Sequence, residues 1–497
     1  MNIKRAKQEI KDTIEAYLMK DEMGEYVIPS IRQRPILLMG PPGVGKTQIM
    51  EQTAKECGIG LVAYTITHHT RQSAVGLPFI EKKQFGGKEY TVTEYTMSEI
   101  VASVYDKMEE TGLSEGILFI DEINCVSETL APAMLQFLQC KTFGSHKIPD
   151  GWIIAAAGNP PEYNKSVREF DVVTLDRIKK ISVEPDYGAW KEYASRKNIH
   201  PAIQSYLSIK PYNLCQIETT VDGKLFATPR GWEDLSELLL VYEKLGKKAD
   251  REVVGQYLQY PKIAKDFTNY LELYDKYQSR YQTEEILAGV IRENVCDQAA
   301  KASFDERLSL VGLLLAKLSS HFASCKERSD QMELLMKHLR RFQELPGETS
   351  LDQIVLEFAS EYEEKKRAEL LTLREDRRYR QVLSVLEEWS QTIKGMEKKD
   401  AGEIWSQLRV WFGEKSDDYE AMVEQGGSML EHAFDFMEAA FGDSQEMVMF
   451  VTELNSRYYS ISFLQEYQCE RYYEYNKRLL FDDREAEILK QLEEKHV

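Results

Sequence analysis

Gly40-Pro41-Pro42-Gly43-Val44-Gly45-Lys46-Thr47 is the stretch of sequence that decides the fold. Its spacing, G-x-x-x-x-G-K-T, is that of a loop whose backbone N–H groups surround a phosphate. The lysine can reach the β and γ phosphates of a nucleotide, and the threonine hydroxyl can hold Mg²⁺ at the start of a helix whose dipole favours negative charge. The sequence therefore predicts that these eight residues form a nucleotide-binding loop.

The residues on both sides of this loop have the pattern that the motif requires. Apolar Ile36-Leu37-Leu38-Met39 precedes it and predicts a buried strand, and Gln48-Ile49-Met50-Glu51 follows as the start of a helix. The alternative, a glycine-rich turn without a ligand, does not explain this strand–loop–helix context.

In a second stretch, Ile117-Leu-Phe-Ile-Asp-Glu122, a predicted buried strand ends in two acids, and Asp121 lies 74 residues beyond Thr47. Ligands bind at the carboxyl ends of strands in an open parallel sheet. At this strand end, Asp121 is suited to binding Mg²⁺ or the water molecules around it. Glu122 is suited to orienting and deprotonating a water that attacks the γ-phosphate.

Composition limits the classes of partner. The chain has 497 residues, too many for one ordinary core, and a formal net charge of −19, which disfavours binding to nucleic acid or an anionic membrane surface. Its seven cysteines are scattered without a C-x-x-C pair and indicate reduced thiols in a cytosolic protein. No run of about 18 apolar residues and no secretory leader is evident, so we expect neither secretion nor a membrane span.

The two motifs, at this spacing, resemble those of AAA+ ATPases. Trp152–Pro160 resembles the sensor 1 strand of that family, with Asn159 at the sensor position, and 145–151 resembles the hairpin inserted before it. Two alternating runs around Gly86-Gly87 predict another hairpin, over 79–95, which resembles a helix 2 insertion. Either it decorates the surface or it contacts a substrate through Phe85 or Tyr90. Together these features resemble the MoxR branch, which is related to magnesium chelatase and MCM-like groups.

The resemblance also assigns arginines to the site. Val173-Thr-Leu-Asp-Arg-Ile178 resembles the family segment whose arginine reaches the nucleotide of a neighbouring subunit, which makes Arg177 the candidate and Arg168 the reserve. Ala227-Thr-Pro-Arg-Gly-Trp232 resembles the sensor 2 motif and implies that Arg230 approaches the γ-phosphate. Pro229 after Thr228 independently predicts the start of a helix.

The expected fold is α/β: a P-loop AAA+ αβα nucleotide domain with a parallel sheet and inserted hairpins (1–185), a helical lid (186–275) and a long all-α C-terminal region (276–497). The resemblance implies ATP and Mg²⁺ as cofactors, with Gly40, Pro41, Pro42, Gly43, Val44, Gly45, Lys46, Thr47, Asp121 and Arg230 binding nucleotide, Thr47 and Asp121 holding the metal, and Glu122, Arg177 and Asn159 catalysing hydrolysis.

The expected function is that of a cytoplasmic, ring-forming ATPase, hexameric by resemblance, that remodels a partner protein or matures its metal cofactor. A protein with a von Willebrand factor A-type domain is the first candidate partner. Residues 276–497 carry 30 basic and 44 acidic side chains, and this acidic helical region is the expected recognition element. Two alternatives stay open: a nucleotide-gated scaffold with little turnover, and an MCM-like DNA motor, which the net charge disfavours.

Overall fold

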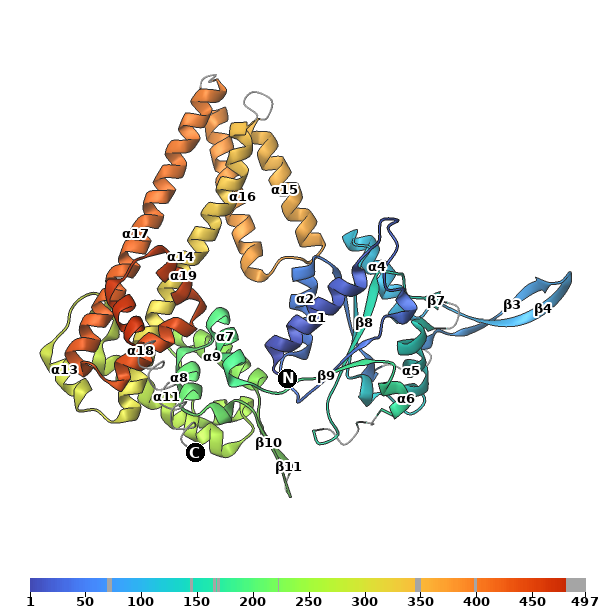
Figure 1. Cartoon of the computed structure of the whole chain (residues 1–497), viewed down its shortest axis with the longest axis horizontal. Helices are drawn as coiled ribbons and strands as arrows, with labels where there is room; N and C mark the ends of the chain where they lie inside the picture. Colours follow the sequence, from blue (N-terminus) through green and yellow to red (C-terminus); the bar gives the residue numbers. More distant parts are fainter. Residues whose placement is uncertain are drawn as a thin grey trace, which may run out of the picture. The chain divides into compact units, whose positions relative to one another are not determined.

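The apolar runs found in the sequence form one parallel sheet. Its strand order is β2-β5-β8-β1-β9, and each pair of neighbours is parallel (Figure 1). The strands are β1 (Ile36–Met39), β2 (Gly60–Thr65), β5 (Gly116–Asp121), β8 (Trp152–Gly158) and β9 (Lys179–Ser182). Since β1, β5 and β8 are adjacent and parallel, the three segments that follow them meet at one edge of the sheet. The predicted α/β class is confirmed.

The structure, a computed structural model, describes residues 1–68, 74–143, 146–163, 167, 170–221, 223–344, 350–396 and 400–479. They divide into two units. The nucleotide unit comprises Met1–Ala189, Thr228–Arg230 and Ala359–Arg377, and the helical unit comprises Trp190–Ala227, Gly231–Phe358 and Arg378–Val497. The expected division into 1–185, 186–275 and 276–497 stays a prediction.

Helices cover both faces of the sheet. One face packs on α1 (Ile3–Leu18) and α2 (Lys46–Cys57), and the other on α4 (Glu99–Thr111) and α5 (Ala131–Cys140). Successive side chains of a strand point to opposite faces, so Ile36 and Leu38 join the α1/α2 core while Leu37 joins the α4/α5 core. The strands β1, β5 and β8 are therefore apolar over nearly their whole length, as the sequence shows. The helix α5 begins at Ala131, directly after a turn formed by Ser127–Leu130.

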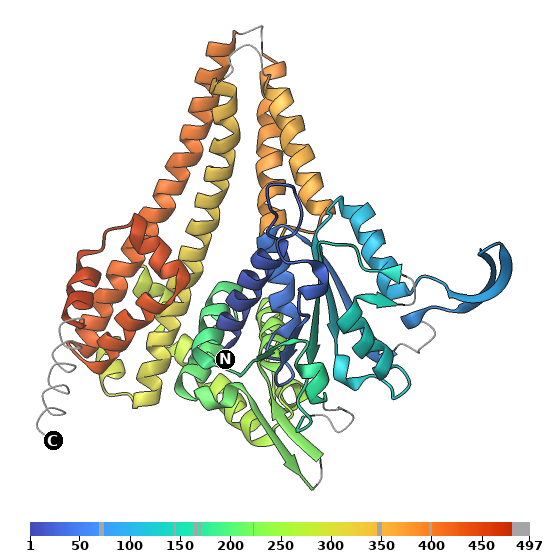
Figure 2. The same ribbon diagram turned by 45° about the vertical axis from the view of Figure 1, so that its right-hand side comes forward.

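The predicted hairpin is present as β3 (Pro78–Phe85) and β4 (Lys88–Tyr95), with Phe85 opposite Lys88. Gly86 and Gly87 have φ values of 57° and 79°, the left-handed conformation that a two-residue hairpin turn requires. In Figure 2 the hairpin projects away from the sheet of the nucleotide unit. A second short hairpin, β6 (Thr142–Phe143) and β7 (His146–Lys147), precedes β8.

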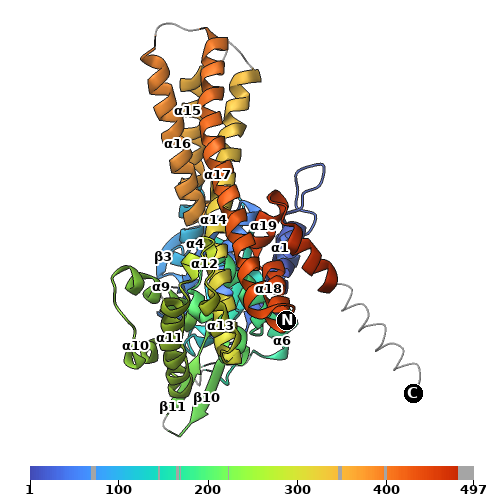
Figure 3. The same ribbon diagram turned by 90° about the vertical axis from the view of Figure 1, so that its left-hand side faces the viewer.

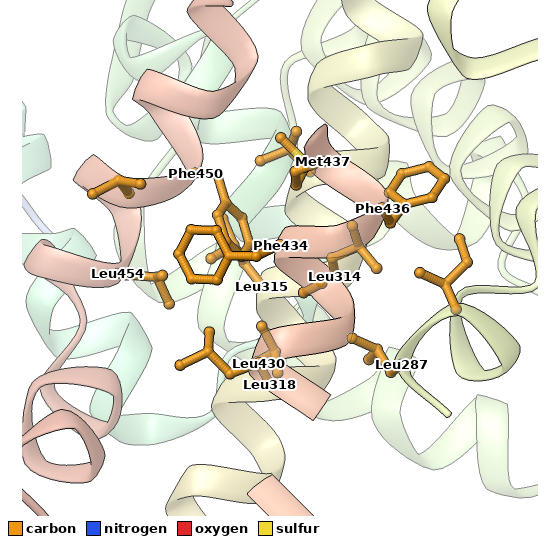
Figure 4. Packing of buried hydrophobic residues seen from close by; sticks show 14 of the residues in the cluster. Leu287, Leu314, Leu315, Leu318, Leu430, Phe434, Phe436, Met437, Phe450 and Leu454 are labelled. Atoms are coloured by element: carbon orange, nitrogen blue, oxygen red, sulfur yellow. The ribbon is translucent and has the colours of Figure 1, made fainter. Parts of the chain in front are cut away.

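The helical unit contains a short hairpin and a large apolar core. The hairpin is β10 (Gln216–Thr220) and β11 (Gly223–Ala227). The helices that lie wholly or partly in this unit are α7 (Tyr187–Lys197), α8 (Pro201–Ile209), α9 (Pro229–Lys244), α10 (Arg251–Tyr257), α11 (Pro261–Tyr281), α12 (Thr283–Leu287), α13 (Glu293–Ala300), α14 (Phe304–Glu344), α15 (Leu351–Arg367), α16 (Leu373–Lys394), α17 (Ala401–Phe441), α18 (Gln445–Ser456) and α19 (Tyr458–Glu466). Figure 4 shows Leu314 and Leu318 of α14 against Leu430 and Phe434 of α17, and free thiols such as Cys325 lie in the same core.

One described helix, α14, is long and apolar enough to cross a membrane by length and composition alone. Its residues Leu314, Leu318 and Phe322 are buried in the protein core, and Phe322 stacks on Phe463 of α19 with ring centroids 4.0 Å apart. Core helices pass the same test, so this observation is weak evidence for a membrane span.

The helix α14 runs beside α17, and α15 runs beside α16 (Figures 2 and 3). Aromatic contacts join them, such as Trp389 of α16 with Trp411 of α17, whose ring centroids are 5.7 Å apart. The turn between α15 and α16 belongs to the nucleotide unit. There Lys55 of α2 donates to the carbonyl of Leu371 (3.2 Å), and Lys107 of α4 forms an ion pair with Glu369 (2.8 Å).

Candidate nucleotide site

The loop at residues 40–47 joins β1 to α2 with little space to spare. Gly45 has a φ of 92° and directly precedes α2, so the chain enters the helix through a left-handed residue that favours glycine. Gly40 packs against Val183, the residue after β9, where an added Cβ would lie 2.5 Å from the carbonyl oxygen. Gly40 is thus required by close packing and Gly45 by its backbone conformation.

The side chain of Lys46 is held in place by three hydrogen bonds. Its Nζ donates to the carbonyl oxygens of Gly40 (2.9 Å) and Pro41 (2.8 Å) and to Oδ1 of Asn159 (2.9 Å). The side chain is only 9% exposed, and burial lowers the pKa of its amine to about 8, with Asp121 acting in the opposite direction. A nearby phosphate would favour the charged amine, so this lysine is prepared for an anion.

Thr47 and Asp121 are the residues suited to Mg²⁺. Thr47 Oγ1 donates to Asp121 Oδ2 at 2.9 Å, which joins the start of α2 to the end of β5. A hydroxyl and a carboxylate are hard oxygen ligands, and Mg²⁺ usually takes one or two carboxylates together with phosphate oxygens. The described residues contain no group of three or more His, Cys, Asp or Glu side chains that could form an all-protein metal site. The donor set therefore fits a metal that is bound together with nucleotide.

Glu122 has an unusual backbone conformation. Its φ is 56°, in the left-handed region, which costs a residue with a Cβ about 1–2 kcal/mol. Its N–H donates to Asp121 Oδ1 (2.9 Å) and its carbonyl accepts from the N–H of Cys125 (2.8 Å), so the turn is held from both sides. Strained backbone that the surroundings enforce is a mark of functional sites.

The sensor strand closes the other side of the site. Asn159 follows β8, and its side chain contacts Lys46, as described above. Its carbonyl oxygen accepts a hydrogen bond from Nδ2 of Asn124 (2.8 Å), a residue of the short 3-10 turn after Glu122. The structure thus brings together Lys46, Thr47, Asp121, Glu122 and Asn159. Sequence reasoning missed Asn124, since a single asparagine in a turn gives no recognisable signal.

Residues 36–175 match the family described as "ATPase family associated with various cellular activities (AAA)". This segment is an AAA-family ATPase domain. It begins with β1 and contains both motifs and the sensor strand. The segments that carry Arg177 and Arg230 lie beyond the matched residues.

Other comparisons add little. A solved structure described as a candidate ATPase from Cytophaga hutchinsonii is similar to this chain at 20% sequence identity with a TM-score of 0.25, over 39% of this chain and 56% of the other. The chain thus spans little more than half the length of that protein. No curated protein matches.

Arg230 lies beside the loop of the AAA domain. Thr228 and Arg230 belong to the nucleotide unit, and a Cβ added to Gly43 would lie 3.0 Å from Thr228 Oγ1 and 3.3 Å from the Cβ of Arg230. The helix α9 starts at Pro229, as predicted. Arg230 is exposed, and its charge contributes to the lowered pKa of Lys46. The second arginine predicted from resemblance is therefore close to the phosphate loop.

Arg177 is placed differently. It follows the short helix α6 (Val172–Leu175), is exposed, and donates through one guanidinium nitrogen to Oε1 of Gln139 at the end of α5. Within the part of the chain that the structure describes, Arg177 makes no hydrogen bond to the cluster of Lys46, Thr47, Asp121, Glu122 and Asn159. Arg168, the reserve candidate, lies outside the described residues.

Proposed function

We propose that the protein is a Mg²⁺-dependent, MoxR-type AAA+ ATPase that works as a ring, with six subunits as the expected number. The observation that carries this proposal is the meeting of Lys46, Thr47, Asp121, Glu122 and Asn159 at the carboxyl edge of the sheet. These groups offer a cation, two oxygen ligands, a carboxylate base and a polar sensor, which is the set that phosphoryl transfer to water needs.

Each residue has a separate role in this proposal. Lys46 neutralises charge on the phosphates, and Thr47 and Asp121 hold Mg²⁺, which when bound would neutralise phosphate oxygens. Glu122 orients the attacking water and takes its proton. Asn159 fixes the lysine through its side chain, and Arg230 adds positive charge from the start of α9.

The exposed position of Arg177 supports an active site shared between two copies of the chain. Because its guanidinium contacts Gln139 and not its own cluster, we assign it to the nucleotide of a neighbouring subunit. An arginine finger of this kind contributes about 10³–10⁵ to the rate in related reactions. The ring is thus part of the proposed mechanism.

The test of the hydrolytic assignment is Glu122→Gln. This variant should still bind ATP, because the lysine, threonine and Asp121 remain, and it should lose hydrolysis because the water has no base. Glu110→Gln is the matched control, since Glu110 is an exposed acid on α4 and the charge change is the same. ATP binding is measured with a fluorescent analogue and hydrolysis by phosphate release. Hydrolysis by Glu122→Gln within a few-fold of the unmodified protein would refute the assignment.

The work done with ATP is proposed to be remodelling, or metal-cofactor maturation, of a partner protein in the cytoplasm. The helical region supports a protein partner over nucleic acid: it is acidic, and several of its basic residues are ion-paired, as Lys365 is with Glu361 (2.7 Å) and Arg378 with Asp330 (2.7 Å). A protein with a von Willebrand factor A-type domain and a basic face fits this surface, because complementary charge speeds association.

The partner proposal is tested with the full chain and the purified product of a neighbouring gene that encodes such a domain. We expect binding that weakens with salt and a change in ATPase rate. Reversing three exposed acids of α17, Glu414, Asp417 and Glu420, should weaken binding, whereas reversing three exposed acids of α4, Asp106, Glu109 and Glu110, should not. Equal effects of the two sets, or none, would argue against recognition through the helical region.

A further inference from the structure

Asn124 is a buried amide that the proposed chemistry does not use. It lies two residues after Glu122 on the turn Ile123–Cys125, and its side chain is 2% exposed. Its Nδ2 donates to the carbonyl oxygen of Asn159 at 2.8 Å. Its Oδ1 is buried and has no hydrogen-bond donor among the residues that the structure describes. Buried polar atoms without a partner are rare, so this amide needs an explanation beyond packing.

Gly158 makes room for this amide. A Cβ added to Gly158 would lie 2.5 Å from Oδ1 of Asn124 and 2.8 Å from its Cγ, and the three nearest atoms all belong to Asn124. The φ of Gly158 lies outside the left-handed region. The glycine is therefore required here for space and not for backbone conformation, and it forms a pair with Asn124.

The hydrogen bond from Asn124 joins two segments at a point beyond the last backbone pairing of their strands. The backbone pairing between β5 and β8 ends at Ile120 and Ala156. Beyond that point the two strands lead to Glu122 and Asn159, and the contact from Asn124 Nδ2 to the carbonyl of Asn159 joins the two segments. The side chain of Asn159 in turn holds Lys46 at 2.9 Å. A continuous set of contacts thus runs from the turn that follows Glu122, through Asn159, to Lys46.

We propose that Asn124 is a positioning residue for ATP hydrolysis: by bonding the backbone of Asn159 within the space left by Gly158, it fixes the separation between Glu122 and the sensor. This inference rests on the proposed hydrolytic function. It assigns Asn124 no contact with nucleotide. Its loss should consequently disturb the placement of the water-activating base more than the binding of ATP.

The experiment compares Asn124→Ala with the unmodified full chain. We expect kcat to fall about 10–100-fold, since displacement of a reacting group by about 1 Å can cost 10²-fold, and the Kd for a fluorescent ATP analogue to change less than about threefold. A role in packing alone would lower the melting temperature and leave kcat of the folded protein unchanged. That result would overturn the proposal.

Gly158→Ala provides a second variant that does not touch Asn124 itself. Its methyl group should displace the amide and lower kcat to a similar extent. In the double variant Asn124→Ala, Gly158→Ala the methyl group has space, so we expect no loss beyond that of Asn124→Ala. Multiplying losses would show that the two positions act independently and would refute the pairing. Should Asn124→Ala fail to fold, Gly158→Ala and Asn124→Ser carry the same comparison.

The test of the positioning role of Asn124 can fail independently of the test of the proposed ATPase function. If Glu122→Gln abolishes hydrolysis and Asn124→Ala retains the full kcat, only the positioning role fails. If Glu122→Gln hydrolyses ATP normally, the proposed function fails, and a fall in kcat on Asn124→Ala would then have to be assigned to a different base.

Discussion

The lowered pKa of Lys46 predicts that ATP binding takes up protons. With a pKa of about 8, the amine of the free protein is largely charged at pH 7 and largely neutral at pH 9. Bound phosphates raise that pKa, so the complex holds more protons than the free protein above pH 7. For a pKa that rises well above 9 on binding, the uptake is about 0.1 proton at pH 7, about 0.5 at pH 8 and about 0.9 at pH 9.

The sign of the pH effect on affinity follows from this uptake. Because binding requires the charged amine, the affinity for ATP falls as pH rises through 8, by about fivefold between pH 8 and pH 9 and toward tenfold per pH unit above that. Calorimetric titrations of a non-hydrolysable ATP analogue, in two buffers with different ionisation enthalpies, measure the uptake directly.

Lys141 provides the control. Burial also lowers its pKa to about 8, but its Nζ contacts Ser30 (3.3 Å) and Gln33 (3.1 Å), away from the loop. Lys141→Gln should leave the nucleotide-linked uptake unchanged. An uptake below about 0.2 proton at pH 9 in the unmodified protein would show that Lys46 is already charged before ATP binds, and would refute the reasoning.

Three further outcomes are expected. Arg177→Ala should hydrolyse ATP about 10³-fold more slowly than the unmodified protein. Mixing it with Lys46→Ala subunits should restore activity, because an intact site can then form between two subunits. If no mixing ratio restores activity, the arginine acts within its own chain. Gly43→Ala should lower the free energy of unfolding by about 1–2 kcal/mol and weaken ATP binding, because its φ is 77° and its Cβ would meet Thr228 at 3.0 Å; an unchanged urea midpoint would contradict this. Phe434→Ala, at a fully buried position of α17, should cost about 3–5 kcal/mol in urea unfolding, and a loss below about 1 kcal/mol would mean that the site is not core.

The sequence was sufficient for the parts of the site that depend on neighbouring residues. The loop from Gly40 to Thr47 carries its own flanking strand and helix, and the strand before Asp121 carries its own apolar run. Both are short-range patterns that tertiary contacts do not override. The hairpin turn at Gly86-Gly87 was predictable for the same reason, because its backbone conformation requires glycine.

Features that depend on two distant segments could not be predicted. The fit of Asn124 to Gly158 depends on the lateral spacing of β5 and β8, which appears only when the sheet forms. The hairpin of β10 and β11 escaped prediction because its residues are largely polar or partly exposed and show no apolar run. The docking of Glu369 on Lys107 joins residues that no sequence pattern relates.

The turn between α15 and α16 has a consequence for synthesis of the protein. The nucleotide unit includes Ala359–Arg377, which contact α2 and α4 through Lys55 and Lys107, so it is not complete when Ala189 leaves the ribosome. At 5–20 residues per second, the missing piece arrives about 10–40 s later. A chain that stops after residue 275 would end inside α11 and lack this piece altogether. The nucleotide unit is therefore completed late in translation. Cutting the chain between its N-terminal and C-terminal halves would not separate a complete nucleotide unit from the helical unit.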